Sequence, residues 1–488
     1  MKPDNPPTSL EPVRDLIRRE LVERSIPSLA VAVTRDGQWL WQEGFGWADR
    51  ERRLAATEHT MYSLASITKP MTATALMVLV ERGAIDLDRP VNAYLSDAPL
   101  RSRVDGREAT VRQVANHTAG LPLHYQFFYA DRPEVPPPFE ETIRRYGNLV
   151  TAPGERHQYS NLGYGVLDHI VAQASGRSYG EFMREAVFLP LNMTRASIGV
   201  DPALAAYAAT PYSVVGRPYP RYGFDHPGAS AAFSSAHDLC RFGLFHIGKA
   251  LTDQAAILSE VSRAAMQRPG EGTGEPGYGI GWGVQASLHG HRVVEHSGGM
   301  GGVATVLRLF PDDGLVAAAL CNVSSDLPFR VVDEVAAALL PTYAEARAAA
   351  PPEPAPTRVG VKRDASWEVR PELIGRWEGS AATYAGSVPV ELRFVPGGFI
   401  HARFGDALWT LLNDVTVDGP WLKGFSDGTM PTPDAERHRH RLLWDLRLRG
   451  DVLNGAVGTF NLEDEERHGR WIGNALCAWV ELHRVGDP

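Results

Sequence analysis

The N-terminal part of the chain changes between helix-like and strand-like hydrophobic patterns. Over residues 10–25, apolar side chains recur at the three- and four-residue spacing of one helix face, which predicts an amphipathic helix. Two apolar runs follow, SLAVAVTRDG and QWLWQEGFGWAD, and the Asp-Gly pair between them is typical of a hairpin turn. A long apolar run from about Ser66 to Arg82 predicts a buried helix that ends at Gly83.

The order of these patterns along the chain predicts the architecture of the first domain. Residues 85–225 mix helical and loop-like stretches, strand-like runs return at 278–323, and a helical pattern closes this part at 328–340. Strands from both ends of residues 10–340 are expected to form one antiparallel sheet, flanked by helices and interrupted by a helical region. The predicted class is α+β.

The pattern changes again in the last third of the chain. Residues 341–364 are rich in Ala and Pro and are typical of a linker. Residues 365–488 alternate apolar and polar positions between Gly and Asp turns, which predicts an antiparallel all-β domain, either a sandwich or a small barrel.

Composition and charge narrow the classes of protein. The net charge of −9 argues against a nucleic-acid partner. No run approaches the ~18 apolar residues of a membrane span, and the N-terminus has no apolar core of the signal-peptide type, so we expect a cytoplasmic protein without a membrane partner. The three cysteines lie far apart and fit neither a disulfide framework nor a zinc cluster.

The first candidate for chemistry is Ser66-Ile-Thr-Lys69, the only Ser-x-x-Lys in the chain. A three-residue spacing at the start of a helix places both side chains on one face. A serine hydroxyl becomes a good nucleophile when a neighbouring base takes its proton, and burial disfavours the charged form of a lysine that is to be this base. The alternative is a serine that caps the helix and a lysine in solvent.

A second candidate is a tyrosine that relays protons. Tyr-x-Asn occurs at Tyr146 and at Tyr159, and only the second follows a Pro-Gly turn and precedes a helical pattern. Ser160 or Asn161 can cap that helix and Gly176 can end it, which would hold Tyr159 in a defined place. The alternative is a half-buried aromatic ring whose hydroxyl is bonded locally.

The third candidate is a strand edge. His-x-Gly occurs three times, starting at His226, His246 and His296, and only the last enters a strand-like run. A strand beside a nucleophile can supply a backbone N–H to an oxyanion, and Gly298 and Gly299 would let a substrate backbone approach closely.

Two other interpretations of the stretch VVEHSGGMGG have less support in the sequence. His289 and His291 lie upstream, but a zinc site needs three or four ligands that converge, and none are evident. A phosphate-binding loop is followed by a helix, whereas here a strand follows. The second glycine pair, Gly301-Gly302, has no specific role in this interpretation.

The three motifs that begin at Ser66, Tyr159 and His296 resemble, in order and context, those of the serine β-lactamase and penicillin-binding-protein superfamily. The likeness is closer to its class C branch, with the related D-aminopeptidases and esterases. The segment NHTAGLP, residues 116–122, is similar to the family's His-Thr-Ser-Gly-Leu-Pro segment, and the resemblance covers roughly residues 10–340.

The resemblance implies an acyl-enzyme mechanism that needs no metal and no cofactor. Ser66 would be the nucleophile, and Lys69 and Tyr159 would share the general-base and general-acid work. Asn161 would orient Lys69 and a substrate amide, and the backbone N–H groups of Ser66 and Gly299 would form the oxyanion hole.

His296 departs from the β-lactamase pattern, which has Lys-Thr-Gly where this chain has His-Ser-Gly. The His-x-Gly form resembles D-stereospecific aminopeptidases and esterases, so efficient β-lactam hydrolysis is not the expected activity. The Gly375-Arg-Trp377 segment is similar to the Gly-x-Trp of lipocalin-like barrels. A catalytic body with such a barrel is the layout of certain D-peptidases and of penicillin-binding-type thioesterases that cyclise nonribosomal peptides.

The sequence leaves several functions open within this resemblance. The leading hypothesis is a serine acyl-enzyme for peptide-like amides, esters or thioesters with preference for D-residues; the substrate is then a small peptide or ester, or a peptidyl thioester bound to a carrier protein. A general carboxylesterase and a binding or sensor protein without turnover are the alternatives. Arginines in residues 437–450 are expected on a solvated strand face, unless the barrel covers the site, where one could bind a substrate carboxylate or a carrier-protein phosphate.

Overall fold

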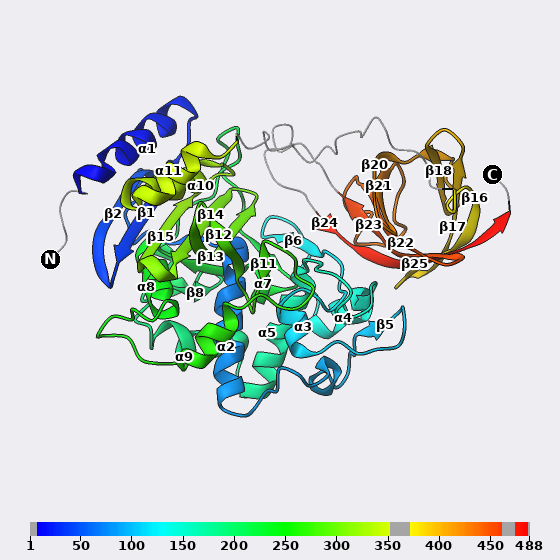
Figure 1. The fold of residues 1–488 in the computed structure, drawn as a ribbon, viewed down its shortest axis with the longest axis horizontal. Helices are drawn as coiled ribbons and strands as arrows, with labels where there is room; N and C mark the ends of the chain where they lie inside the picture. Colours follow the sequence, from blue (N-terminus) through cyan, green and yellow to red (C-terminus); the bar gives the residue numbers. More distant parts are fainter. Residues whose placement is uncertain (1–6, 352–370, 461–473, 487–488) are drawn as a thin grey trace.

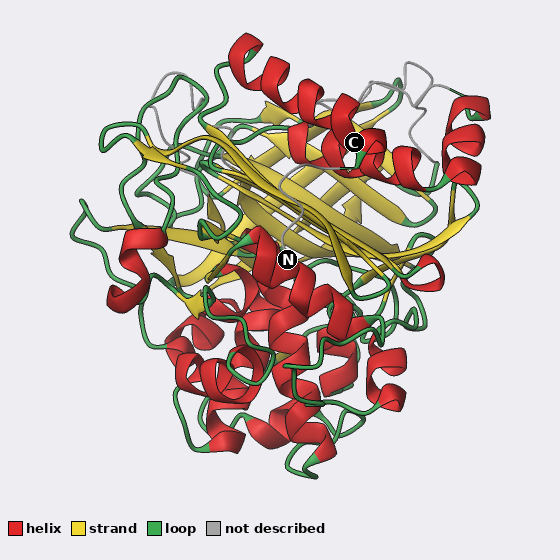
Figure 2. Cartoon of the chain, turned by 90° about the vertical axis from the view of Figure 1, so that its left-hand side faces the viewer, coloured by secondary structure: helices red, strands yellow, loops and turns green. Residues whose placement is uncertain are grey.

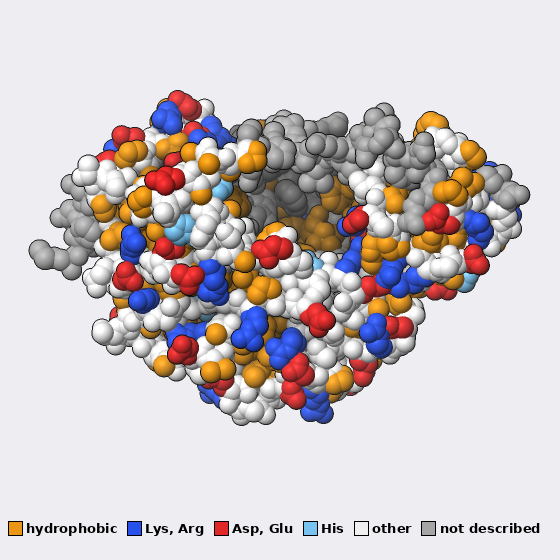
Figure 3. Space-filling model, in the orientation of Figure 1, with side chains coloured by type: hydrophobic (Ala, Val, Ile, Leu, Met, Phe, Trp, Pro, Cys, Tyr) orange, Lys and Arg blue, Asp and Glu red, His pale blue; other side chains and the backbone are white. Residues whose placement is uncertain are grey.

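The computed structural model describes residues 7–351, 371–460 and 474–486. It has two domains, a larger one with helices around a sheet and a smaller one made of strands (Figure 1). Figure 3 shows a hollow between them with hydrophobic side chains on its floor.

One antiparallel sheet of eight strands forms the centre of the first domain, and both ends of the domain contribute to it. The strand order is β11-β12-β13-β14-β15-β1-β2-β3. The N-terminal hairpin therefore pairs with the last strand of the domain, as predicted. The strands are β1 (Ser28–Arg35), β2 (Gln38–Asp49), β3 (Leu54–Ala55), β11 (Gly277–Tyr278), β12 (Gly283–Leu288), β13 (His291–Met300), β14 (Val303–Phe310) and β15 (Leu315–Cys321).

Helices cover both faces of this sheet, so its central strands are apolar on both sides (Figure 2). Strands β14 and β15 are buried at every position for that reason. One face is covered by α1 (Glu11–Glu23), α10 (Leu327–Leu339) and α11 (Pro341–Ala349). The other face packs against α8 (Ala236–His246) and the helical region, which contains α2 (Thr68–Glu81), α3 (Val111–Ala115), α4 (Phe139–Tyr146), α5 (Asn161–Ser175), α6 (Tyr179–Met183), α7 (Pro227–Ser230) and α9 (Glu260–Met266).

Short strands join segments that are distant in the sequence. One small sheet contains β4 (Tyr62–Ser63), β10 (Ala232–Ser234) and β8 (Ser197–Ile198). Another contains β9 (Tyr222–Phe224), β6 (Tyr125–Tyr129) and β24 (Asn474–Ala475). A parallel pair joins β5 (Arg101–Ser102) and β7 (Asn148–Leu149). The second of these sheets includes residues of both domains.

The second domain is a nine-stranded antiparallel sheet in the order β19-β18-β17-β16-β25-β23-β22-β21-β20. β19 and β20 are consecutive in the chain but lie at opposite ends of this order, so the sheet curves into a nearly closed barrel. Trp377 and Trp444 are fully buried. The strands are β16 (Gly375–Thr383), β17 (Gly386–Val395), β18 (Phe399–Phe404), β19 (Thr410–Leu411), β20 (Asn413–Asp418), β21 (Trp421–Ser426), β22 (Arg441–Arg449), β23 (Val452–Phe460) and β25 (Cys477–Gly486).

The structure confirms the predicted α+β fold with an all-β domain after it, but the start of the predicted linker differs. Residues 341–349, at the start of the predicted linker, form helix α11. The Tyr343 ring is buried against the first domain, and its hydroxyl donates to Asp333 Oδ1 at 3.2 Å. The remainder of that stretch, from 352, and the first residues of the predicted barrel, 365–370, lie outside the described residues. Among the described residues, no helix is both long and apolar enough to cross a membrane.

Candidate active site

Ser66 lies on a tight turn at the start of the buried helix α2. A short 3₁₀ turn, Ala65–Ile67, precedes α2, and Ala65 has a φ of 48° in the left-handed region, which a residue with a Cβ rarely adopts. The N-cap residue of α2 is Ile67, so Ser66 is not the helix cap that the alternative required. The turn instead leaves the hydroxyl half-exposed above Lys69.

Lys69 is fully buried, and its three partners determine where its lone pair points. The Nζ atom lies 3.1 Å from Ser66 Oγ, 2.8 Å from Asn161 Oδ1 and 3.1 Å from the Ala229 carbonyl oxygen. The Asn161 Nδ2 group donates to the His124 carbonyl oxygen at 2.8 Å, which fixes Oδ1 as the acceptor facing Lys69. A neutral amine has two N–H groups and one lone pair. The Asn161 and Ala229 oxygens can only accept, so each takes one N–H group. The lone pair of Lys69 therefore faces the Ser66 hydroxyl.

The surroundings of Lys69 favour this neutral amine. Burial lowers the pKa of Lys69 well below its ordinary value because the ammonium is removed from water. None of its hydrogen-bond partners carries a negative charge that would counter the effect. Lys69 therefore has the protonation state and the geometry of a general base for Ser66.

The lowered pKa of Lys69 also affects stability. In the unfolded chain this lysine stays protonated up to about pH 10.4, whereas in the folded protein it loses its proton at lower pH. The unfolded state binds more protons between these two pKa values, so stability rises with pH across that window. We expect the melting temperature to rise less between pH 7 and pH 9 in Lys69→Met than in the wild type. Equal gains, measured by calorimetry, would show that Lys69 does not titrate below its ordinary range.

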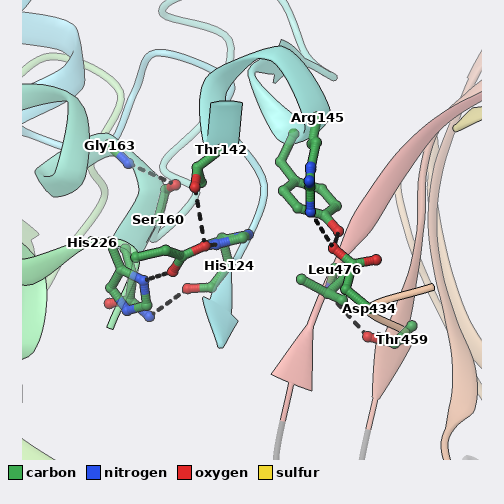
Figure 4. Close-up of polar contacts among 12 residues, drawn as sticks. His124, Thr142, Arg145, Ser160, Gly163, His226, Asp434, Thr459 and Leu476 are labelled. Carbon is green, nitrogen blue, oxygen red and sulfur yellow. Dashed lines mark hydrogen bonds and ion pairs between the residues drawn. The ribbon is translucent and has the colours of Figure 1, made fainter. Parts of the chain in front are cut away.

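Tyr159 is held beside both residues by the cap of helix α5. Ser160 is the N-cap, and its hydroxyl accepts from the Gly163 N–H at 3.2 Å (Figure 4). The helix ends at Gly176 with a φ of 67°, as predicted. The Tyr159 side chain lies beside Ser66, and Lys69 Nζ lies 4.6 Å from the centre of the Tyr159 ring.

Tyr159 is a neutral phenol at neutral pH. Burial raises the pKa of Tyr159 above its ordinary value, and the hydrogen bond with Ser66 only partly counters this. The nearby lysine does not stabilise a phenolate, because the same burial makes that lysine neutral. These protonation states suit Lys69 to the role of a base and Tyr159 to that of a proton donor.

Strand β13 lies against the turn that carries Ser66. A Cβ on Gly298 would lie 2.0 Å from the Leu64 carbonyl oxygen, and that oxygen accepts from Thr305 Oγ1 at 3.0 Å. Gly299 follows with an exposed surface and lines the same pocket as Ser66. Gly298 is therefore required for close packing, and Gly299 is open to a substrate.

Substitution of Gly298 by alanine is expected to lower kcat/KM about tenfold or more. The new methyl group would meet backbone that cannot rotate away, so the Ser66 turn must move from the strand. Gly180→Ala in α6 is the matched control, because its Cβ would find its nearest atom at 3.8 Å. Steady-state ester hydrolysis compares the two variants. Equal activity of both would contradict the close packing described here.

The second glycine pair belongs to the hairpin turn between β13 and β14. Gly302 has a φ of 72°, and a Cβ there would lie 2.6 Å from Pro211 Cβ. The Gly301 carbonyl oxygen accepts from the Tyr222 hydroxyl at 2.7 Å. This turn, which the sequence left without a role, anchors β13 to the segment around β9.

His296 lies in β13 but directs both ring nitrogens into the protein. Nδ1 lies 2.7 Å from the Ser297 carbonyl oxygen, which can only accept, so this nitrogen carries the proton. Nε2 then accepts from the Tyr278 hydroxyl at 2.9 Å. Burial lowers the pKa of His296 to about 3, so the ring is neutral. Its catalytic role stays a prediction, and these bonds favour positioning over direct contact with substrate.

Residues that the motifs did not identify complete the pocket. Its wall beside Ser66 and Asn161 is formed by Tyr125, Phe127, Phe224, His226, Ser230 and Met300. The His117 ring lies 4.4 Å from the Tyr159 ring between centroids, and its Nδ1 accepts from the Ser160 N–H at 3.2 Å. His117 stands in the quoted HTAGLP segment, which was the available signal, whereas His226 was set aside in the search for His-x-Gly strands.

Charged side chains of the barrel bind the loop that leads to Tyr159. Arg447 and Arg449 of β22 both pair with Glu155, the second at 2.6 Å. Asp445 of the same strand accepts from Arg156 Nη2 at 2.6 Å. These arginines were expected on a solvated face, but the structure uses them at the domain interface, three or four residues before the candidate proton relay.

A second contact joins the barrel to the wall of the pocket. β24 pairs with β6, so that Ala475 lies opposite Tyr125 and Asn474 opposite Gln126. Tyr146, at the end of α4, donates from its hydroxyl to Asp434 of the barrel. The discounted Tyr-x-Asn motif at Tyr146 is therefore a structural contact between domains.

Replacement of Glu155 by glutamine is expected to lower kcat about tenfold. The amide keeps the size of the side chain but removes the charge that two arginines contact, so the loop before Tyr159 loses its fixed position. Glu378→Gln is the matched control, because Glu378 pairs with Arg376 at 2.9 Å on the surface of the barrel. Single-turnover acylation rates separate the two, and a Glu155 variant as fast as the control would refute the positioning role.

Comparison with known proteins matches the first domain to a protein family. The Beta-lactamase family model matches residues 13–341. Penicillin-binding protein 4* of Bacillus subtilis (strain 168) is 26% identical over 321 residues, or 61% of this chain and 69% of that protein. Unguisins hydrolase ungD' of Aspergillus campestris (strain IBT 28561) is 27% identical over 330 residues, or 63% of this chain and 60% of that protein.

Among solved structures, the octameric penicillin-binding protein homologue from Pyrococcus abyssi shares the fold. It has a TM-score of 0.58 at 22% identity and covers 96% of this chain and 100% of its own. The chain belongs to the β-lactamase family, whose members are serine hydrolases. The chain spans 60% of the length of the unguisins hydrolase, less than two thirds of that relative.

Proposed function

We propose that the protein is a serine acyl-enzyme for peptide-like esters, thioesters or amides, with preference for D-residues. The observation that carries this proposal is the hydrogen-bond set of Lys69, whose lone pair has only the Ser66 hydroxyl to face. Such an arrangement activates a serine towards an acyl group, and Tyr159 beside both atoms can protonate the leaving group.

The proposed reaction follows from these positions. Lys69 takes the Ser66 proton as Oγ forms a bond to the acyl carbon, and the N–H groups of Ser66 and Gly299 stabilise the oxyanion. Tyr159 passes a proton to the leaving group and regains one from the Lys69 ammonium. The acyl ester then reacts with water, which gives a linear acid, or with an internal amine, which gives a macrocycle.

The walls of the pocket and the relatives support a peptide-like acyl group. Tyr125, Phe127 and Phe224 offer aromatic surface to an apolar side chain. The relatives named above are a penicillin-binding protein and a hydrolase of unguisins. Preference for D-residues and cyclisation rest on the His-x-Gly motif and on the presence of a C-terminal barrel, both of which resemble D-peptidases and penicillin-binding-type thioesterases.

The proposal is tested with linear peptidyl thioesters that end in a D- or an L-residue, offered beside a simple nitrophenyl ester. Mass spectrometry of the products distinguishes cyclic peptide from linear acid. Faster turnover of the D-peptide supports the proposal, and equal rates on all three compounds favour the general carboxylesterase. Acylation of Ser66 without release would indicate a binding or sensor protein.

A further inference from the structure

Helix α3 ends on a histidine with an unfavourable backbone conformation. The Thr118 N–H donates to the Gln113 carbonyl oxygen at 2.8 Å. The His117 N–H donates to the Val114 carbonyl oxygen at 3.3 Å, and the two bonds together form a Schellman motif. His117 occupies the left-handed position of this motif, with a φ of 62°. Glycine is usual there because it has no Cβ, and strain of this kind is typical of residues that a functional site needs.

His117 binds the backbone on both sides of Tyr159. Its carbonyl oxygen accepts from the Gln158 N–H at 2.7 Å, and its Nδ1 accepts from the Ser160 N–H at 3.2 Å. A backbone N–H can only donate, so Nδ1 carries a lone pair and the proton of the neutral ring is on Nε2. Burial lowers the pKa of His117 well below its ordinary value, so the ring keeps this form at neutral pH. One residue therefore fixes the chain before and after Tyr159.

The imidazole of His117 also packs against the Tyr159 ring. The centroids of these two rings lie 4.4 Å apart, and the rings of Tyr278 and Tyr164 lie 4.7 and 5.2 Å from that of His117. His117 is only 2% exposed, so its ring is out of reach of a substrate. Its Nε2 is buried and has no hydrogen-bond partner among the described residues. Any effect of this ring on catalysis must therefore pass through the residues that it contacts.

We propose that His117 is a positioning residue that holds Tyr159 where its hydroxyl can protonate the leaving group. This inference rests on the proposed function, because it concerns how the Ser66 acyl-enzyme forms. As the bond between the acyl carbon and the leaving atom breaks, its electron pair takes the Tyr159 proton, and Tyr159 regains a proton from the Lys69 ammonium. The leaving group departs as a neutral alcohol, thiol or amine.

The placement of Tyr159 decides which leaving groups the enzyme accepts. Nitrophenolate is a weak base and departs without a proton, whereas an alkoxide or an amide anion is a strong base that departs only with one. With Tyr159 held in place, alkyl esters and amides are substrates as well as activated esters. A displacement of the donor by about 1 Å is enough to cost about a hundredfold in rate, which would restrict the enzyme to activated esters.

The nitrophenyl and methyl esters of N-acetylphenylalanine test the inference on the full-length protein, in the enantiomer that the wild type turns over faster. Both esters form the same acyl-enzyme, so their kcat/KM values compare the leaving groups alone. His117→Gly keeps the backbone conformation that the end of α3 needs but removes the ring. Its kcat/KM is expected to fall about a hundredfold for the methyl ester and no more than about threefold for the nitrophenyl ester.

Three further single variants isolate the hydrogen bond to Ser160. The amide oxygen of His117→Asn can replace Nδ1 as acceptor, and asparagine tolerates the left-handed conformation, so at least about tenfold of the loss should be recovered. His117→Gln fills the space of the ring but carries its oxygen one atom further out, so it should behave like the glycine variant and replaces it if that variant is unstable. His289→Gly is the matched control, because His289 has a φ of 50° and its ring contacts Tyr343.

The control should keep the wild-type ratio between the two esters. The ratio is taken within one preparation, so a partly unfolded variant does not change it. Tyr159→Phe then shows whether His117 acts through Tyr159. This change removes the proton donor, so it should raise the preference for the nitrophenyl ester at least as far as His117→Gly does. In the double variant, His117→Gly should change the ratio no more than about threefold further.

The outcomes separate the inference from the proposed function. Equal losses on both esters in His117→Gly or His117→Gln overturn the inference, and so does a loss that His117→Asn leaves as large. A further hundredfold change in the double variant overturns it as well, because His117 then acts on another group. A wild type that cleaves the nitrophenyl ester alone overturns the inference and leaves the serine acyl-enzyme standing. If neither ester acylates Ser66, the proposed function fails, and the inference fails with it.

Discussion

Replacement of Ser66 by alanine is expected to lower kcat/KM for ester substrates at least about 10⁴-fold. In the proposed mechanism the hydroxyl is the nucleophile that Lys69 activates, and among the described residues no other group stands at the end of the lysine's lone pair. The melting temperature should stay close to that of the wild type, because Ser66 makes no helix cap and its side chain is small.

Intact-protein mass after incubation with a slowly released ester measures this effect directly. The wild type should gain the mass of the acyl group, and Ser66→Ala should gain none. Ser175→Ala is a suitable control, since Ser175 is the last residue of α5, at the end of the helix away from Tyr159. Full activity of the Ser66 variant on every substrate would contradict the proposed mechanism.

The change Lys69→Met is expected to lower kcat about 10³-fold, within the range for loss of a general base. Methionine fills a similar volume but leaves the Ser66 hydroxyl without a base, and Tyr159 cannot substitute because its raised pKa keeps it protonated. Single-turnover acylation is the appropriate measurement, because release of the product then does not hide the loss.

The dependence of kcat/KM on pH is a further test of the role of Lys69. The active form has a neutral Lys69, so kcat/KM should be flat around neutral pH and fall as the pH drops through the lowered pKa of that lysine. The acid limb should be absent from the residual activity of Lys69→Met. A wild-type rate that rises only near pH 10 would mean that Lys69 titrates like an ordinary surface lysine.

The sequence predicted those parts of the site that lie close together in the chain. Ser66 and Lys69 are one helical turn apart, and the motif at Tyr159 is held by a cap and a terminating glycine that are visible as residue types. The sheet followed from two apolar segments at the ends of the first domain, because strands that are buried on both faces are apolar throughout. These features depend on local periodicity, which a single sequence contains.

Features that depend on contacts between distant segments were not predicted. His226 meets the pocket only because α7 packs beside α2 and α5, and Glu155 meets Arg449 across 294 positions of the chain. His296 stands where the β-lactamase pattern has a lysine, and the sequence made it a candidate catalytic residue. Its nitrogens bond to Ser297 and Tyr278 instead, because a short, buried ring is satisfied by its nearest acceptor and donor. Such pairings leave no periodic pattern in the sequence from which they could be predicted.

The pairing of β24 with β6 has a consequence for how the enzyme is made. Ribosomes synthesise the chain from its N-terminus, so Ser66 and Lys69 emerge long before Asn474 and Ala475. Until those last strands arrive, β6 has an unpaired edge, and the aromatic wall formed by Tyr125 and Phe127 lacks its neighbour. In the proposed mechanism, selective acylation would therefore need β24 in place beside this wall of the pocket.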